Sequence, residues 1–235
     1  MSAAIVIEPR FRGPPESGNG GYVCGRIAVE LGLPVAVRLL APPPLATTLI
    51  LREDPQRNRW QLLDGERAVA EARPAEVTPV PPVPPSYAEA VDASRRCTGL
   101  VHHPLPTCFV CGPQRAPGDG LRIFAGEVTG RAMVAAPWTP DESLADGAGR
   151  VRPEFLWSAL DCPGFFAAPL GGALALLGEL AVRIERPLPA GGPCVVVGWP
   201  VASEGRKHRT GTAVFGPGGE LVACAEATWV ALKQA

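Results

Sequence analysis

Two stretches of this sequence repeat each other in the same order. Residues 36–39 read Ala-Val-Arg-Leu, residues 181–184 read Ala-Val-Arg-Ile, and proline-rich segments follow both runs. Further along, Gly-Glu-Arg-Ala-Val-Ala at 65–70 has a counterpart in Gly-Glu-Leu-Val-Ala-Cys at 219–224. A unit that occurs twice builds a two-fold interface within one chain. Small-molecule sites commonly form at such interfaces, so the repetition predicts a ligand site between the two halves.

The composition is that of an ordinary globular protein. Of the 235 residues, 46% are hydrophobic, which suffices for one large or two small domains. The formal net charge is −1, so no overall positive field favours nucleic acid or an anionic membrane. Residues 1–8 carry no basic segment or long apolar run, and the seven cysteines favour reduced thiols over a disulfide framework. We therefore expect a cytoplasmic protein without nucleic-acid or membrane partners.

The first half of the chain reads as a strand, a helix and several further strands. A glycine-rich loop at 17–21 precedes a predicted helix over 22–31, because apolar residues recur there on one face. The proline-rich run at 78–85 lacks the N–H donors that a sheet requires. We therefore expect a linker over 78–107 with a short helix beginning at Ser86. The strands predicted for this half cover 4–7, 35–40, 47–51, 60–63 and 67–72.

The second half repeats this pattern. A helix is predicted from Pro153 through Asp161, with Pro163-Gly164 expected to disturb it near its middle or end. These elements predict an α+β protein in which each of two antiparallel sheets wraps around one helix, with the sheets joined into one continuous sheet. The expected repeats are residues 1–77 and 108–235. The strands predicted for this half cover 121–124, paired with 131–135, then 180–185, 194–200, 210–215 and 221–232.

The pattern resembles the hotdog fold in its tandem form, the double hotdog, in which two repeats imitate a homodimer. Residues 204–229 look like the final hairpin of thioesterases similar to the phenylacetic-acid-pathway enzyme. The run Cys-Phe-Val-Cys-Gly at 108–112, followed by Gly-Leu-Arg-Ile at 120–123, is similar to the lead-in to the first strand in many members of that superfamily. Together with the repetition, the resemblance covers most of the chain outside the linker.

The resemblance implies a catalytic site between the repeats. In hotdog thioesterases a glycine-rich turn at a helix N-terminus polarises the thioester carbonyl, and an acid within a helix serves as general base or nucleophile. Asn19, Gly20 and Gly21 match the turn, with Asn19 in place of the usual histidine, and Asp161 matches the acid. The other halves of both motifs are missing, since neither an acid after Gly21 nor a glycine pair before Asp161 is present. One composite site is therefore expected, with an inactive mirror-image counterpart.

Structural interpretations of the same residues stay open. Asp161 could stabilise a turn at a helix end, and the glycine turn could be only a loop and a helix cap. Glu154 fits a capping role in the first helical turn. Ser158 could line the cleft, but no histidine partner marks it as a nucleophile. Aromatic residues near the second helix could wall an acyl pocket or belong to the core, namely Phe155, Trp157, Phe165 and Phe166.

Coenzyme A, as part of the substrate, would need cationic partners for its phosphates. The densest basic cluster follows Gly205 at the start of a predicted strand. It would be either a phosphate contact or a charged, solvated edge of the sheet. The residues of this cluster that we expect to bind substrate are Arg206, Lys207 and Arg209.

A metal site is an alternative interpretation of several residues in and next to the linker. The Cys108-x-x-Cys111 spacing matches a zinc knuckle, and Cys97 with one histidine, His103, would complete a tetrahedral set. The family resemblance accounts for Cys108 and Cys111 without a metal, and a second CxxC is absent. We therefore expect no required metal or cofactor, with a structural zinc as the alternative.

The leading hypothesis is hydrolysis of an acyl-thioester, an acyl-CoA, at the interface of the repeats. Asp161 would act as base or nucleophile, and Gly21 would polarise the carbonyl. The rival hypothesis is a non-catalytic acyl-thioester binding or regulatory protein of the same fold. A hydratase or dehydratase would need an acid paired with histidine, and neither predicted active helix contains a histidine. The partner is a small molecule, and formation of a homo-oligomer stays open.

Overall fold

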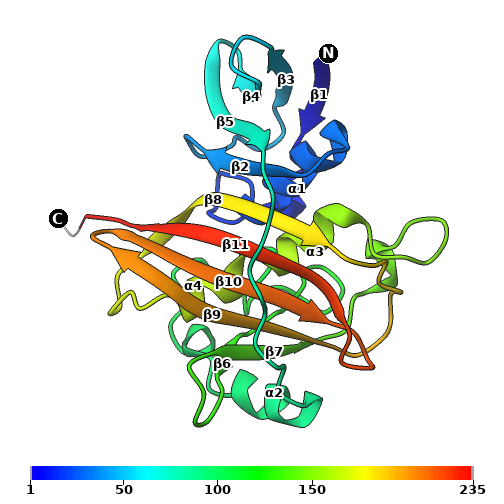
Figure 1. Cartoon of the computed structure of the whole chain (residues 1–235), viewed down its shortest axis with the longest axis vertical. Coiled ribbons are helices and arrows are strands. Elements are labelled where there is room, and N and C mark those ends of the chain that lie inside the picture. Colours follow the sequence, from blue (N-terminus) through cyan, green and yellow to red (C-terminus); the bar gives the residue numbers. More distant parts are fainter. Residues whose placement is uncertain (1, 234–235) are drawn as a thin grey trace.

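The computed structural model describes residues 2–233, whose strands form one antiparallel sheet of 11 strands (Figure 1). No helix within these residues is long and apolar enough to span a membrane. The strands are β1 Ser2–Val6, β2 Val35–Leu39, β3 Thr48–Asp54, β4 Arg59–Asp64, β5 Arg67–Pro74, β6 Gly126–Glu127, β7 Val134–Trp138, β8 Ala175–Ile184, β9 Cys194–Glu204, β10 Lys207–Phe215 and β11 Leu221–Ala231. The helices are α1 Gly20–Leu31, α2 Tyr87–Ser94, α3 Pro153–Ala159 and α4 Cys162–Ala167, with 3-10 turns at Pro9–Phe11, Thr98–Leu100 and Glu142–Leu144.

The strand order is symmetric about the junction between β2 and β8. On one side of β2 follow β5, β4, β3 and β1, and on the other side of β8 follow β11, β10, β9 and β7, with β6 beyond. At the junction Ala36 lies opposite Ala181 in an antiparallel pair, and these two alanines begin the matching runs of the sequence. The predicted continuous sheet is therefore present, and its two halves meet at the repeated segment.

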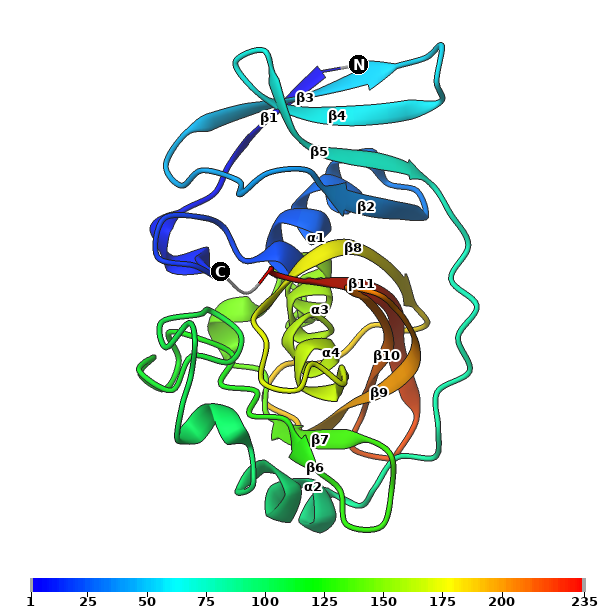
Figure 2. The same ribbon diagram turned by 90° about the vertical axis from the view of Figure 1, so that its left-hand side faces the viewer.

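Two helices cross where the sheet curves around them. In Figure 2 the strands β8, β11, β10, β9 and β7 curl around α3 and α4, and α1 lies beside α3. A Cβ atom on Gly21 would lie 2.6 Å from Asp161 Cβ, and one on Gly25 would lie 2.8 Å from Glu154 Cα. Because real Cβ atoms do not come so close to other atoms, these glycines are what allows α1 to approach α3.

The second predicted helix is divided into two. Helix α3 ends at Ala159, and Asp161 has φ −80° and ψ −81°, outside the helical range. A new helix, α4, starts at Cys162 and carries Pro163 in its first turn, where a missing N–H costs no hydrogen bond. The expectation that Pro163-Gly164 disturbs one helix near its middle or end was therefore wrong. The proline helps to start a second helix, and Asp161 stands at the junction between the two.

The other predicted strands are present with shifted ends, except the one at 121–124. There the N–H groups of Leu121 and Ile123 donate to the carbonyls of Phe109 and Val110, at 2.8 and 2.9 Å. The backbone of Arg122 has a positive φ of 55°, which interrupts an extended conformation. The strand pair expected there starts instead at β6, which pairs with β7.

The proline-rich segment runs along the outside of the molecule from β5 to α2 (Figure 2). Residues 75–86 contain no helix or strand, as the lack of N–H donors predicted. Ser86 caps α2 through a reciprocal pair of hydrogen bonds with Glu89, a capping box. The short helix expected after Ser86 is confirmed.

Candidate active site

Asp161 joins the two halves of the molecule at the start of α1. Its carboxylate Oδ2 accepts hydrogen bonds from Asn19 Nδ2 at 2.7 Å and from the backbone N–H of Gly21 at 3.0 Å. Asn19 and Asp161 are 142 positions apart in the sequence. The structure thus places the carboxylate on the N-terminus of α1, where unpaired N–H groups and the helix dipole favour a negative charge.

Asp161 gives up its proton less readily in this environment than an aspartic acid side chain does in water. The residue is only 2% exposed, and burial raises the pKa of its carboxyl group to about 7. The Gly21 and Asn19 hydrogen bonds lower this pKa, whereas negative charge on nearby Cys108 raises it. Within residues 2–233 the second oxygen, Oδ1, is buried without a hydrogen-bond partner. One oxygen of the carboxylate is therefore anchored, and the other is available for a ligand.

The first three amides of α1 differ in what they bind. Asn19 caps the helix, because its Oδ1 accepts the Tyr22 N–H at 2.9 Å. The Gly21 N–H is taken by Asp161. Gly20, the first residue of the helix, lines the cavity described next, and its N–H has no hydrogen-bond partner among the described residues. Of the first three amides of α1, that of Gly20 is therefore the one left free to bind a ligand.

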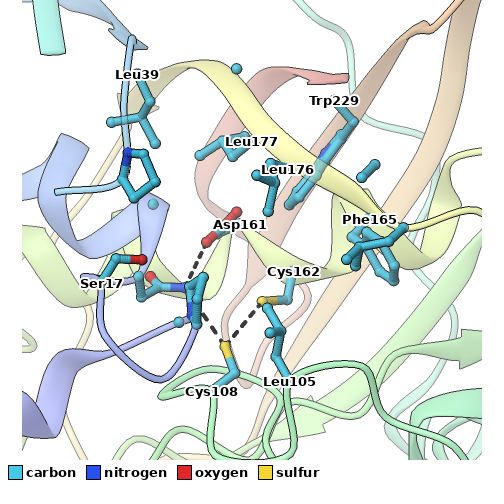
Figure 3. A pocket seen from close by; sticks show the side chains of 18 of the residues that line it. Ser17, Leu39, Leu105, Cys108, Asp161, Cys162, Phe165, Leu176, Leu177 and Trp229 are labelled. Atoms are coloured by element: carbon cyan, nitrogen blue, oxygen red, sulfur yellow. Dashed lines mark hydrogen bonds between the residues drawn. The ribbon is translucent and has the colours of Figure 1, made fainter. Parts of the chain in front are cut away.

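A cavity of about 310 Å³ opens in front of this helix terminus (Figure 3). Asn19, Gly20 and Asp161 line its polar end. Its walls are mostly apolar, which suits a hydrocarbon chain or ring more than a charged group. The apolar side chains that line it include Leu39, Leu105, Phe165, Leu177 and Trp229.

Comparisons with known proteins agree on the fold. No protein-family model matches the sequence, and no curated protein matches it. Among solved structures, a TesB protein from Mycobacterium avium subspecies paratuberculosis matches over 99% of this chain and 93% of its own, with 14% identity and a TM-score of 0.65. A protein of unknown function with a hotdog fold from Alicyclobacillus acidocaldarius matches over 100% and 94%, with 11% identity and a TM-score of 0.61. This chain has the hotdog fold.

A third match points to the same group of hotdog structures. A candidate thioesterase from Novosphingobium aromaticivorans covers 99% of this chain and 96% of its own, with 13% identity and a TM-score of 0.60. The resemblance to thioesterase-superfamily proteins that the sequence predicted therefore extends over nearly the whole chain. At this level of identity the matches establish the hotdog fold, and the activity has to be argued from the site.

Three residues expected to contact substrate lie in the hotdog core instead. Phe155 packs against the rings of Phe11, Tyr22 and Phe109. Trp157 lines a second cavity on the opposite side of the helices, and the Ser158 hydroxyl donates to the Glu154 carbonyl at 2.7 Å. The chain turns at Asp161, so α3 faces the core and it is α4 that reaches the cavity. Of the four aromatic residues considered, the cavity is lined by Phe165 alone.

The basic cluster lies at the edge of the cavity and does not line it. Arg206 donates to the Ala231 carbonyl at 3.2 Å, next to Leu232, which does line the cavity. Arg209 forms an exposed ion pair with Glu226, and Lys207 is exposed at the start of β10. Arg206 thus lies near Leu232, and Lys207 lies opposite Val230 in the β10–β11 pair, so both cations are next to residues that line the cavity.

The metal ligands expected from the sequence do not come together as a set. Among the described residues, the group that could hold a metal ion is Cys108, Cys111 and Cys162. Cys97 lies outside this group. His103 Nδ1 accepts the Leu105 N–H at 3.0 Å, so in the neutral ring Nε2 carries the proton and neither nitrogen offers a free lone pair. The third sulphur comes from α4, and no local spacing in the sequence signals it.

Proposed function

We propose that this protein hydrolyses an acyl-thioester in the cavity at the start of α1, with Asp161 as the reactive acid. The observation that carries the proposal is the buried Asp161 carboxylate, which is anchored through one oxygen and unpaired at the other. Buried carboxylates of this kind are typical of catalytic positions. The TesB-like and thioesterase-like hotdog neighbours support the same chemistry.

The proposed reaction uses the two available groups at the polar end of the cavity. Asp161 Oδ1 accepts a proton from a water molecule, whose oxygen attacks the thioester carbonyl carbon. The Gly20 N–H, at the positive end of α1, donates to the carbonyl oxygen and stabilises the negative charge that develops there. The carbon–sulphur bond then breaks, and the thiolate leaves with the proton. Asn19 and Gly21 position Asp161, so the polarising role expected for Gly21 passes to Gly20.

Asp161 could also attack the carbonyl directly and form an anhydride, which water then hydrolyses. The two routes differ in the source of the oxygen. Under single-turnover conditions in ¹⁸O-labelled water, a general base leaves Asp161 unlabelled. Label in Asp161 therefore identifies direct attack in which water opens the anhydride at the Asp161 carbonyl carbon.

We also propose that the chain is a tandem hotdog, with repeats 1–77 and 108–235 joined by the linker 78–107. The symmetric strand order and the Ala36–Ala181 pair at its centre support this proposal. The pairing is what a two-fold axis through the junction requires, because it exchanges the two repeated runs. The reactive site then lies between the repeats, with the N-terminus of α1 from the first and Asp161 from the second.

The substrate that this cavity fits best is an acyl-CoA. The apolar walls suit the acyl group, and Arg206 and Lys207, next to lining residues of β11 and its end, are candidates for phosphate contacts. This substrate would make the protein's partner a small molecule of the cytoplasm.

Hydrolysis of a panel of acyl-CoAs by wild type, Asp161→Asn and Glu154→Gln tests the proposal. Asn retains the shape and an acceptor for the Gly21 N–H but cannot take a proton, so we expect turnover to fall about 10²- to 10⁴-fold. Glu154 is a matched control, because it is also a buried acid near the helix crossing and does not line the cavity. Wild-type rates in Asp161→Asn would overturn the proposed role of this residue.

A binding protein without activity is the second candidate. One observation favours it: Asn19 and Gly21 are already satisfied by Asp161, so the polar groups need no substrate to pair. In that case acyl-CoA raises the melting temperature of the wild type, and no hydrolysis is seen with any acyl group.

A further inference from the structure

Three thiols gather on the wall of the cavity beside Asp161. Cys108, Cys111 and Cys162 are all buried and all line the cavity (Figure 3 shows Cys108 and Cys162). Their sulphur atoms lie within 4.8 Å of one another, and those of Cys108 and Cys162 are 3.8 Å apart. We propose that these three cysteines form a binding site for a thiophilic metal ion, with Zn²⁺ as the expected occupant.

The spacing of the sulphur atoms suits such an ion. A Zn–S distance of about 2.3 Å in a tetrahedral site places neighbouring sulphur atoms about 3.8 Å apart. The Cys108–Cys162 separation already equals this value. The third sulphur needs to move by at most about 1 Å, which a change in its side-chain torsion provides.

The backbone holds the first two thiols in a tight turn. The Gly112 N–H donates to the Cys108 carbonyl at 2.9 Å, and a Cβ on Gly112 would lie 2.5 Å from that oxygen. This close approach explains why glycine follows Cys111. Asn19 Nδ2 lies 3.8 Å from the Cys108 sulphur. Such donors orient and stabilise thiolate ligands in metal sites.

Three buried thiols can also pack as small apolar side chains, so the surrounding groups decide between the interpretations. The protonated His103 Nε2 and Asp161 Oδ1 are buried polar atoms without partners, and both residues line the same cavity. An apolar cluster would not need these donors and acceptors around it.

A soft cation matches this set of donors. Thiolates select Zn²⁺ and Cu⁺ over Mg²⁺ or Ca²⁺, and zinc sites with three protein ligands keep a fourth position for water or another ligand. Because all three cysteines line the cavity, the fourth position faces it. The bound ion would then lie beside the Asp161 carboxylate.

Titration of the reduced, metal-free protein with Cd²⁺ tests the site without any substrate. Cd²⁺ serves as the probe because thiolate coordination gives it a charge-transfer absorption in the ultraviolet. We expect saturation at one equivalent per chain, reversal by competing Zn²⁺, and at least an approximately 100-fold weaker affinity in Cys162→Ala and in Cys111→Ala. Cys24→Ala is the matched control, since Cys24 is equally buried but lies within α1 outside the cluster, and it should bind like the wild type.

The absence of the absorption in the wild type would overturn the proposal, whatever the variants do. Equal affinity in Cys162→Ala and the wild type, or equal loss in Cys24→Ala and Cys162→Ala, would also contradict it. Circular dichroism of each variant shows whether it is folded. If either Cys162→Ala or Cys111→Ala does not fold, the other variant still tests the site. Because the readout is metal binding, the result stands apart from whether the protein hydrolyses thioesters.

Discussion

The two ends of the crossing between α1 and α3 look alike in fold and differ in chemistry. At the end proposed as the active site, α1 starts with the Asn19 cap and meets a carboxylate from the other half. At the opposite end, α3 starts at Pro153 with no side-chain cap, and the residues of α1 that line the cavity there are Ala28 and Val29. A symmetric sheet can therefore carry a one-sided site, because a few side chains at helix ends decide the chemistry.

The cavities at the two ends of the crossing differ in the same way. The second cavity is larger, about 700 Å³, and is lined by residues of both halves, including Val29 from the first and Trp157 from the second. Its lining includes one carboxylate, that of Glu76, which lies outside the helices, and no glycine pair precedes Pro153 at the start of α3. Space between the repeats is thus not sufficient for the proposed activity.

The largest effect is expected from exchanging the acid between the two ends. Asp161→Ala should reduce acyl-CoA hydrolysis about 10²- to 10⁴-fold, because the substitution removes the proposed proton acceptor. Adding Val29→Asp to that variant places an acid at the opposite end and should restore nothing, because α3 has no glycine turn there. Steady-state rates of both variants measure this, and recovery in the double variant would contradict the one-sided site.

A smaller but clear loss is expected from closing the contact between the helices. Gly21→Ala forces a Cβ to within 2.6 Å of Asp161 Cβ and 2.8 Å of the Trp157 carbonyl oxygen. We expect it to lower the free energy of unfolding by about 1–3 kcal/mol and to displace Asp161. Gly25→Ala is the control, since it makes an equally close contact farther along the crossing. Denaturant unfolding should show similar losses of stability, and only Gly21→Ala should also lower the activity of the folded fraction.

Acyl selectivity should respond to a single wall residue. Leu177→Ala enlarges the cavity next to Gly20 and should favour longer or bulkier acyl groups over short ones by about 10-fold in relative kcat/KM. Val182→Ala, on the same strand at the second cavity, is the matched control and should leave the preference unchanged. An equal shift of the acyl preference in both variants would contradict the assignment of the acyl group to the cavity beside Gly20.

The smallest effect is expected at the basic cluster. Arg206→Ala should raise KM for acyl-CoA up to about fivefold at low salt, because an exposed cation contributes at most about 1 kcal/mol. Added salt should remove the difference. Arg209, already paired with Glu226, provides the comparison, and an Arg209→Ala effect larger than that of Arg206→Ala would reverse our assignment.

More of the fold than of the candidate site could be predicted from the sequence. The repeated runs at 36–39 and 181–184 were predicted to lie in strands, since β-branched and apolar alternation is local, but it is the structure that shows the halves joining there. The division of α3 from α4 was missed, because Pro163 is compatible with both a helix end and a helix start. That turn is also why Phe165 lines the cavity and Phe155 does not.

The site residues show the same limit. Asn19 and Asp161 were selected through a family resemblance, and the capping role of Asn19 was foreseen as an alternative. Neither the Asp161–Gly21 hydrogen bond nor the approach of Cys162 to Cys108 leaves a local pattern, because both depend on how distant segments pack. Contacts of this kind are not encoded in residue spacing.

A crystal structure of Asp161→Asn with a bound acyl-CoA tests the one-sided site most directly. The account predicts the thioester carbonyl within hydrogen-bond distance of the Gly20 N–H and the acyl group between Leu177 and Trp229. It also predicts no ligand at the opposite end of the helix crossing. An acyl group bound in the cavity beside Val29 and Trp157 would contradict it.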